Sequence, residues 1–333
     1  MALRNVQVLL PETDQASLET LMKNERLVSW WREGGLDQRV NLQYLLPAEE
    51  TEELLDSLEQ QFGKREGFRV IISGVEAVLP RPAPEPATEP IHPSIPAAKK
   101  FYRVSREELL SAVADGSQLN RIFIAMVILS SVVAAVGLSR DSVAVIIGAM
   151  VIAPLLGPNM GAALATTLGD VGMIRSSART LFVGVALSLL FGVVFGALFP
   201  VNIESNEMIL RAQAMHPFDL VLALASGAAG ALSFTTGAGS ALIGVMVAVA
   251  LLPPLIASGI FLGSGSMAPA LNAALLFLAN FICVNLAAVG TFLLQGIRPR
   301  TWWEDKKAKR MARRALATWI VLLAALAAIV VFG

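Results

Sequence analysis

The sequence predicts an α-helical polytopic membrane protein with about seven spans, preceded by a small α+β ferredoxin-like domain. Three observations predict this fold class. Hydrophobic residues make up 55% of the 333 positions and charged residues only 16%, whereas soluble domains carry about 25% charged residues. Most acidic residues lie in the first 110 positions. The apolar runs that follow approach or exceed the roughly 20 residues that a helix needs to cross a bilayer.

The N-terminal domain is expected over residues 1–79, where short alternating and amphipathic segments follow one another in the order βαββαβ. Val40, Leu42 and Tyr44, for example, alternate with polar side chains, as in a strand with one buried face. This element order is typical of a ferredoxin-like sandwich. The expected elements are Val6–Leu10, Glu12–Lys23, Leu27–Trp31, Arg39–Leu46, Pro47–Phe62 and Phe68–Leu79.

Residues 80–100 are expected to form a linker. Proline recurs there every two to four residues up to Pro96, and no periodic apolar face is present. Such a composition is typical of an extended, semi-rigid spacer. The transmembrane domain then covers residues 101–333. It opens with Ser105-Arg-Glu-Glu108, a capping-box pattern that predicts a short helix at the membrane surface.

Seven apolar segments follow the linker. Only nine charged residues lie between Ile122 and Gln295, all at or near the gaps between segments. A charge at the centre of a spanning helix costs about 2.5–3.5 kcal/mol on insertion scales, so this distribution is the one expected of membrane spans. The segments are residues 119–138, 142–168, 178–200, 217–235, 239–262, 268–295 and 313–332.

Lysine and arginine in the short loops predict the orientation of the chain. With seven spans, Arg175, Arg179 and the basic run Arg298–Arg314 lie on the same side as the N-terminal domain, and only Arg140 and Arg211 lie on the other. The positive-inside rule therefore places the N-terminal domain in the cytoplasm and the chain in the inner (plasma) membrane. The net charge of zero disfavours a nucleic-acid partner.

Two of the spans contain similar sequences. Residues 147–158 (IGAMVIAPLLGP) align without a gap on residues 243–254 (IGVMVAVALLPP), at a constant offset of 96. The matches lie in the second and fifth segments, so the repeated unit is three spans, residues 119–200 and 217–295. An odd number of spans repeated in tandem crosses the bilayer in opposite directions, as in the inverted repeats of many secondary transporters. Residues 313–332 form an extra span outside the repeat.

Prolines make the repeated segments candidates for broken helices. Each proline removes an amide donor and clashes with the carbonyl four residues earlier, and in lipid a freed carbonyl is tolerated only in protein or beside water. The second halves are expected to begin at about Asn159 and Leu255 and to point their positive dipole ends inward. Half-helix N-termini suit an anion and freed carbonyls suit a cation, and both alternatives stay open. The candidate binding residues are Met150, Pro154, Gly157, Pro158, Asn159, Val249, Ala250, Pro253, Pro254 and Asn280.

Several of these residues also have purely structural interpretations. Asn159 is placed either to cap the second half-helix or to contact a ligand, and Asn280 and Asn285 either bind or join neighbouring helices. Asp141 is expected to complement the dipole of the helix that follows it. Gly157 adds backbone freedom. The spacing of Gly157 with Gly161, and of Gly192 with Gly196, predicts either close helix approach or a homo-oligomer face.

No catalytic constellation is apparent in the sequence. The two histidines, His92 and His216, belong to no cluster with cysteine and carboxylates that would hold a metal. The sequence contains no phosphate-binding loop of the Walker type. We therefore expect a protein that is not an enzyme and that needs no cofactor.

The segment Ser142–Pro158, with Gly148-Ala-Met-Val-Ile-Ala-Pro-Leu-Leu-Gly-Pro158 at its centre and Gly161 and Leu168-Gly-Asp170 after it, resembles a known family. The family comprises hydrophobic membrane proteins of bacteria and archaea with domain of unknown function 389. The resemblance extends over residues 115–295. It implies a membrane location, and longer members of the family carry a small α/β domain before the spans. It implies no substrate and no catalytic residues.

The sequence thus predicts a transporter or channel for a small solute or ion, with its site between two proline-broken helices. The soluble domain would regulate or assemble it, and the expected partners are the lipid bilayer, the solute and further copies of the chain. The alternative is a non-transporting membrane sensor or scaffold, whose N-terminal domain binds a small ligand or a partner. Water access to the broken segments distinguishes the two hypotheses.

Overall fold

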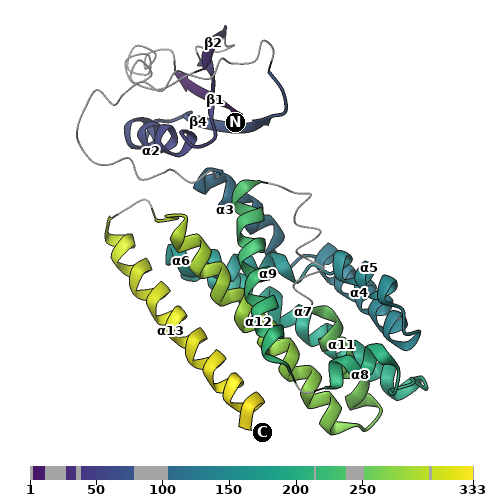
Figure 1. Ribbon diagram of the computed structural model, residues 1–333. Helices are drawn as coiled ribbons and strands as arrows, with labels where there is room; N and C mark the ends of the chain where they lie inside the picture. The colour runs from purple at the N-terminus through teal and green to yellow at the C-terminus, as the bar shows by residue number, and fades with distance from the viewer. Residues whose placement is uncertain are drawn as a thin grey trace. The chain divides into compact units, whose positions relative to one another are not determined.

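The computed structural model describes residues 3–11, 28–34, 39–78, 104–213, 215–237, 251–299 and 302–332. The chain divides into two compact units, Met1–Leu109 and Leu110–Gly333. Figure 1 shows the helices and strands of both units in chain order. The linker predicted over residues 80–100 lies outside the described residues.

The first unit contains a four-stranded antiparallel sheet of β1 (Leu3–Pro11), β2 (Ser29–Gly34), β3 (Arg39–Pro47) and β4 (Arg69–Val75). The strand order is β2-β3-β1-β4, with Val6 of β1 opposite Tyr44 of β3 and Ile72 of β4. All four predicted strands are therefore present among the described residues. β2 begins two residues later than expected and continues to Gly34. The helix predicted over Glu12–Lys23 lies outside the described residues.

Helix α2 (Thr51–Phe62) packs on one face of this sheet. It begins four residues later than predicted because β3 continues to Pro47 and a turn follows. Alternation along the strands places one set of side chains against the apolar stripe of the helix. The resulting core consists of Val6, Val8, Leu10, Val40, Leu42, Tyr44, Leu46, Leu54, Leu58 and Phe62.

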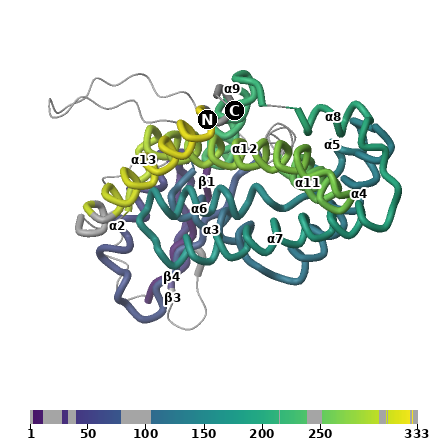
Figure 2. The backbone as a smooth tube through the Cα atoms, turned by 90° about the horizontal axis from the view of Figure 1, so that it is seen from below, coloured from purple at the N-terminus to yellow at the C-terminus, as the bar shows by residue number. Residues whose placement is uncertain are grey.

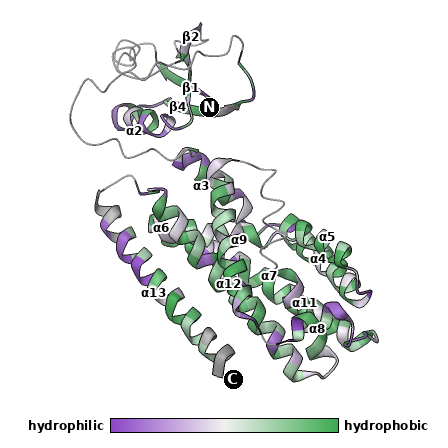
Figure 3. Cartoon of the chain, viewed as in Figure 1, coloured by the Kyte–Doolittle hydropathy of each residue, from purple (hydrophilic) through white to green (hydrophobic). Residues whose placement is uncertain are grey.

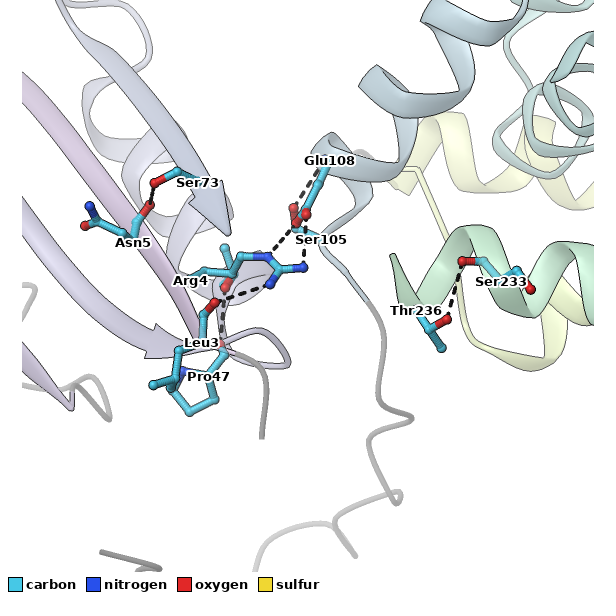
Figure 4. Close-up of polar contacts among 10 residues, drawn as sticks. Leu3, Arg4, Asn5, Pro47, Ser73, Ser105, Glu108, Ser233 and Thr236 are labelled. Atoms are coloured by element: carbon cyan, nitrogen blue, oxygen red, sulfur yellow. Dashed lines mark hydrogen bonds and ion pairs between the residues drawn. The ribbon is translucent and has the colours of Figure 1, made fainter. Parts of the chain in front are cut away.

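Helix α3 (Arg106–Gly116) begins in the first unit, where its first turn is held by ion pairs. Ser105 Oγ accepts a hydrogen bond from the Glu108 amide, as the capping pattern predicts. The Glu108 carboxylate also accepts a hydrogen bond from Arg4 Nε at 3.0 Å (Figure 4). Arg106 bonds Asp56 of α2 at 2.9 Å. Burial opposes the charge of Arg106, but Glu107 and Asp56 outweigh it and raise the pKa of its guanidinium.

The second unit is helical and continues from the end of α3. After α3, bends and loops separate nine further helices among the described residues, and Figure 2 shows their paths from below. The helices are α4 (Arg121–Ser139), α5 (Val143–Ile152), α6 (Leu156–Leu168), α7 (Val171–Leu198), α8 (Asn206–Ala212), α9 (Pro217–Thr236), α11 (Leu252–Gly263), α12 (Met267–Leu294) and α13 (Trp302–Phe332), with α3 leading into them.

 

Four of these helices, α4, α7, α9 and α12, are long and apolar enough to cross a membrane, and a fifth span results if α5 and α6 count as one bent helix. The described residues therefore show four or five candidate spans and do not confirm seven. The first half of the predicted fifth segment, residues 239–250, lies outside them. The predicted span 313–332 forms the second part of α13, which is hydrophilic near its start and apolar further along (Figure 3).

Asp141 lies just before α5, as the sequence suggested, but its carboxylate bonds the start of a different helix. It lies between α4 and α5 with a φ of 53°, a backbone conformation that aspartate tolerates better than most residues. Its carboxylate accepts hydrogen bonds from the Glu207 amide at 2.7 Å and from Asn206 Nδ2 at 3.0 Å. Asp141 thus holds the start of α8, a contact between residues 65 and 66 positions apart that local sequence does not reveal.

Candidate functional site

The candidate site is centred on the break between α5 and α6. The two helices meet at an angle of 49°. Ala153 is extended, with φ −66° and ψ 120°, because a residue that precedes a proline is pushed out of the helical conformation. Pro154 has no amide hydrogen to offer the carbonyl of Met150, so α5 cannot continue past this point. The predicted break is therefore present, and the side chain of Met150 beside it is 8% exposed.

The prolines after the break begin a helix and do not interrupt one. Pro158 is the third residue of α6, and Pro253 and Pro254 are the second and third residues of α11. Proline is tolerated in a first turn, where its missing amide would have had no helical partner. Helices α6 and α11 therefore begin at Leu156 and Leu252, three residues before the starts predicted at about Asn159 and Leu255. These starting residues are separated by the same offset of 96 that aligns the two sequences. Residues 238–250, just before Leu251, lie outside the described part of the chain.

Both half-helices are enclosed by other helices. Ten of the 13 residues of α6 are buried, and so are ten consecutive residues of α11, from Leu252 to Phe261. By contrast, α7 exposes large apolar side chains such as Phe182 and Leu198. Both α6 and α11 pack against α7 and against α12. A helix that is apolar and buried on all sides belongs to the interior of a bundle.

The glycines of α6 allow close approach. A Cβ atom on Gly157 would lie 2.4 Å from the carbonyl oxygen of Gly116, and one on Gly161 would lie 2.2 Å from Ser117 Oγ and 2.6 Å from Ser177 Oγ. The Ser117 hydroxyl in turn bonds the carbonyl of Gly157 at 3.2 Å. Gly157 is thus required for the close contact with Gly116, and its φ is not positive.

A pair of buried amides joins α6 to α12 beside the break. Asn285 Nδ2 donates to Asn159 Oδ1 and, at 2.9 Å, to the carbonyl of Phe281. The side chains of Asn159 and Asn285 are 0% and 2% exposed. Asn159 does not cap α6, because the cap residue is Leu155 and no side-chain cap bond is formed there among the described residues. The capping interpretation of Asn159 is therefore wrong.

The orientation of the Asn159 amide follows from these bonds. The backbone carbonyl of Phe281 can only accept a hydrogen bond, so the Asn285 atom that bonds it must be the amide nitrogen, Nδ2. Because the same nitrogen donates to Asn159, the Asn159 atom that it meets must be the oxygen, Oδ1. The Asn159 nitrogen faces away from the pair. Within the part of the chain that the structure describes, Asn159 Nδ2 is buried and has no hydrogen-bond partner. Buried polar atoms without a partner are few in native proteins, and each calls for an explanation.

The remaining predicted residues have mixed outcomes. Val249 and Ala250 lie outside the described residues. Asn280 is 9% exposed and lies on α12, five positions before Asn285 and therefore on another side of that helix. Asn272, a further amide of α12, joins helices, since its Nδ2 donates to the carbonyl of Ala212 at 2.7 Å. Asn285 joins α12 to α6 through Asn159, a pairing that the sequence did not reveal because 126 residues separate the two.

Comparison with known proteins supports the resemblance seen in the sequence. A family model described as "Domain of unknown function (DUF389)" matches residues 150–286, a stretch that holds the break, both prolines of α11 and the amide pair. The chain is also 31% identical over 291 residues to "Uncharacterized protein MJ0678" of Methanocaldococcus jannaschii, with 87% of each chain covered. No solved structure matches. The chain thus belongs to the DUF389 family.

Proposed function

We propose that the protein is a membrane transporter or channel for a small solute or ion, and that the solute binds between the two proline-containing half-helices. The observation that carries this proposal is the break between α5 and α6. The helix that follows the break, α6, is buried on nearly all sides. Half-helices that end inside a bundle place unpaired backbone groups at membrane depth, where they serve as ion or solute ligands in many transporters. A bundle that only anchors a soluble domain has no need of such a break.

The arrangement of the helices supports two inverted three-span units, residues 119–200 and 217–295. The half-helix of the first unit, α6, and its counterpart α11 in the second unit each pack against both α7 and α12, the last helices of the two units. Equivalent helices with equivalent neighbours are expected of two units related by a twofold axis in the membrane plane. With span 313–332, the full count in this proposal is seven.

The remaining parts of the chain have supporting roles in the proposal. The strand order β2-β3-β1-β4 is that of a ferredoxin-like domain, which would lie in the cytoplasm and regulate or assemble the inner-membrane bundle. The partners are lipid, the solute and further copies of the chain, and no nucleic acid. In this proposal the protein is not an enzyme. A homo-oligomer would have to use surfaces other than Gly192 and Gly196 of α7, which lie against α11 in the same chain.

Flux into liposomes tests the proposed function. The full chain is purified, reconstituted and assayed with chloride, nitrate, acetate, sodium, potassium and small neutral metabolites. We expect uptake of at least one solute about tenfold above protein-free liposomes. Pro154→Ala restores the missing amide and should reduce that uptake severalfold, because it favours a continuous helix. Pro269→Ala, in the first turn of α12, is the matched control and should transport normally.

Two results would contradict the proposal. One is the lack of any flux from folded, correctly inserted protein, which would favour the sensor or scaffold. The other is equal flux through the Pro154→Ala and Pro269→Ala variants, which would separate transport from the break.

A further inference from the structure

The buried amide nitrogen of Asn159 indicates which chemical class of solute can bind at the break. It is a hydrogen-bond donor, its residue is 0% exposed, and it has no partner among the described residues. Burying a donor without a partner is unfavourable. A ligand that accepts a hydrogen bond would satisfy this nitrogen, whereas a cation would be repelled by it.

The amide nitrogen of Asn159 lies close to the start of α6. Side chains of an α-helix lean toward its N-terminus, so the amide of Asn159, the fourth residue of α6, lies alongside the first turn. The amides of Leu156 and Gly157 in that turn receive no side-chain cap from the described residues. The first turn of a helix carries about half a positive charge. Backbone and side-chain donors therefore accumulate at the same place.

The surrounding charges and the second half-helix also favour a ligand that accepts hydrogen bonds over a cation. Residues 143–168, which form α5, the break and α6, contain no Asp, Glu, Lys, Arg or His, so no carboxylate of these helices neutralises the positive end of α6. In the repeat-related helix, Pro253 and Pro254 remove two of the first three amides of α11, and Leu255 occupies the position equivalent to Asn159. The donors are thus concentrated on α6, and the site is asymmetric.

We infer that the solute bound at the break is a small anion, either an inorganic anion or the carboxylate of a small organic acid, and that Asn159 Nδ2 donates to it. The oxygen of Asn159 remains engaged with Asn285, which holds the donor in place. This inference rests on the proposed function for its transport aspect, but the binding site itself can be tested without transport.

Thermal stability in detergent tests the anion site directly. A ligand that binds only the folded protein raises the unfolding temperature as its concentration increases. The full chain is titrated with the sodium salts of chloride, nitrate and acetate, and then with the chlorides of sodium, potassium and choline. We expect stabilisation that depends on the anion and not on the cation. Chloride and nitrate compared with acetate distinguish an inorganic anion from a carboxylate.

The matched variants are Asn159→Asp and Asn272→Asp. The first keeps the oxygen that pairs with Asn285 but replaces the donor with an acceptor. The same stabilisation should then need an anion concentration at least tenfold higher. The second makes the same change where the amide only joins α12 to Ala212. It should lower the unfolding temperature but keep the anion dependence. Should Asn159→Asp not fold, Asn159→Leu in the same titration removes the donor without adding a charge.

Each outcome of the titration is decisive for the site. Stabilisation that follows the cation, stabilisation by no salt, or an anion dependence that Asn159→Asp or Asn159→Leu leaves within twofold of the original overturns the inference. Liposome flux separates the two proposals. Anion binding without flux contradicts transport but keeps the site, and flux of a cation or neutral solute without anion binding keeps transport but overturns the site.

Discussion

Replacing Gly196 with alanine is expected to lower the free energy of unfolding by about 1–3 kcal/mol, the usual cost of overpacking a well-packed contact. A Cβ atom at this position would lie 2.3 Å from the carbonyl oxygen of Ile260 in α11, a backbone atom that cannot move aside without shifting the helix. Gly192 of α7 and Gly259 and Gly263 of α11 line the same crossing. Small residues at this spacing allow two helix backbones to touch.

The matched control is Gly290→Ala in α12, where a Cβ atom would meet nothing within 4 Å. Alanine is favoured over glycine by about 1 kcal/mol in a helix interior, so this change should be neutral or stabilising. Thermal unfolding in detergent measures both variants. Equal stability of the two would show that α7 and α11 do not approach as described. A change in oligomer size with Gly196→Ala would instead assign these glycines to a contact between chains.

Removing one member of the buried amide pair is expected to destabilise the bundle by about 1–3 kcal/mol, because the other is left without its partner. Asn285→Ala deprives Asn159 Oδ1 of its donor, so neither polar atom of that side chain keeps a partner among the described residues. Asn159→Ala leaves Asn285 its bond to the Phe281 carbonyl and should cost less. The double variant should cost less than the sum of the two single variants.

A double-mutant cycle gives the coupling directly. We expect a coupling energy of about 0.6–2 kcal/mol, the range found for hydrogen bonds between membrane helices. The same cycle for Asn159→Ala and Asn272→Ala is the control and should be additive, since Asn272 bonds Ala212 and not the pair. Additivity in both cycles would mean that α6 and α12 are not joined through Asn159 and Asn285.

Much of this fold was predictable because its signals are local. Alternation in residues 39–46 predicts β3, and the long apolar runs predict α4, α7, α9 and α12 within a few residues, apart from the earlier start of α7 at Val171. Pro154 predicts the break, because the loss of one amide acts on the carbonyl four residues earlier. The start of each half-helix was misplaced because proline both ends one helix and begins the next.

The parts that the sequence could not predict depend on contacts between distant residues. In the sequence, Asp141 looks like an acidic residue at the start of the next helix. In the structure its φ is positive, and its carboxylate accepts a hydrogen bond from the first turn of α8. The glycine spacing of α7 predicts close packing but not that the partner is α11 of the same chain. That Asn159 Nδ2 has no partner within the described part of the chain follows only once Asn285 has fixed the orientation of the amide.

In the proposed function, water and solute reach the break between α5 and α6 and the start of α11, and cysteine modification measures this access most directly. Cys283 is the only cysteine in the chain, so Cys283→Ala provides a background for single cysteines at Ala153 beside the break and at Leu251 before α11. Val194, which is exposed on α7, and Ala134, which is packed within α4, are the lipid-facing and core controls.

Each variant is reconstituted and treated with a membrane-impermeant thiol reagent. We predict modification of the cysteines at positions 153 and 251 from at least one side, slowed by the transported solute, and little modification at positions 134 and 194. If positions 153 and 251 react no faster than the two controls, the break is a dry packing feature and the proposed site does not exist.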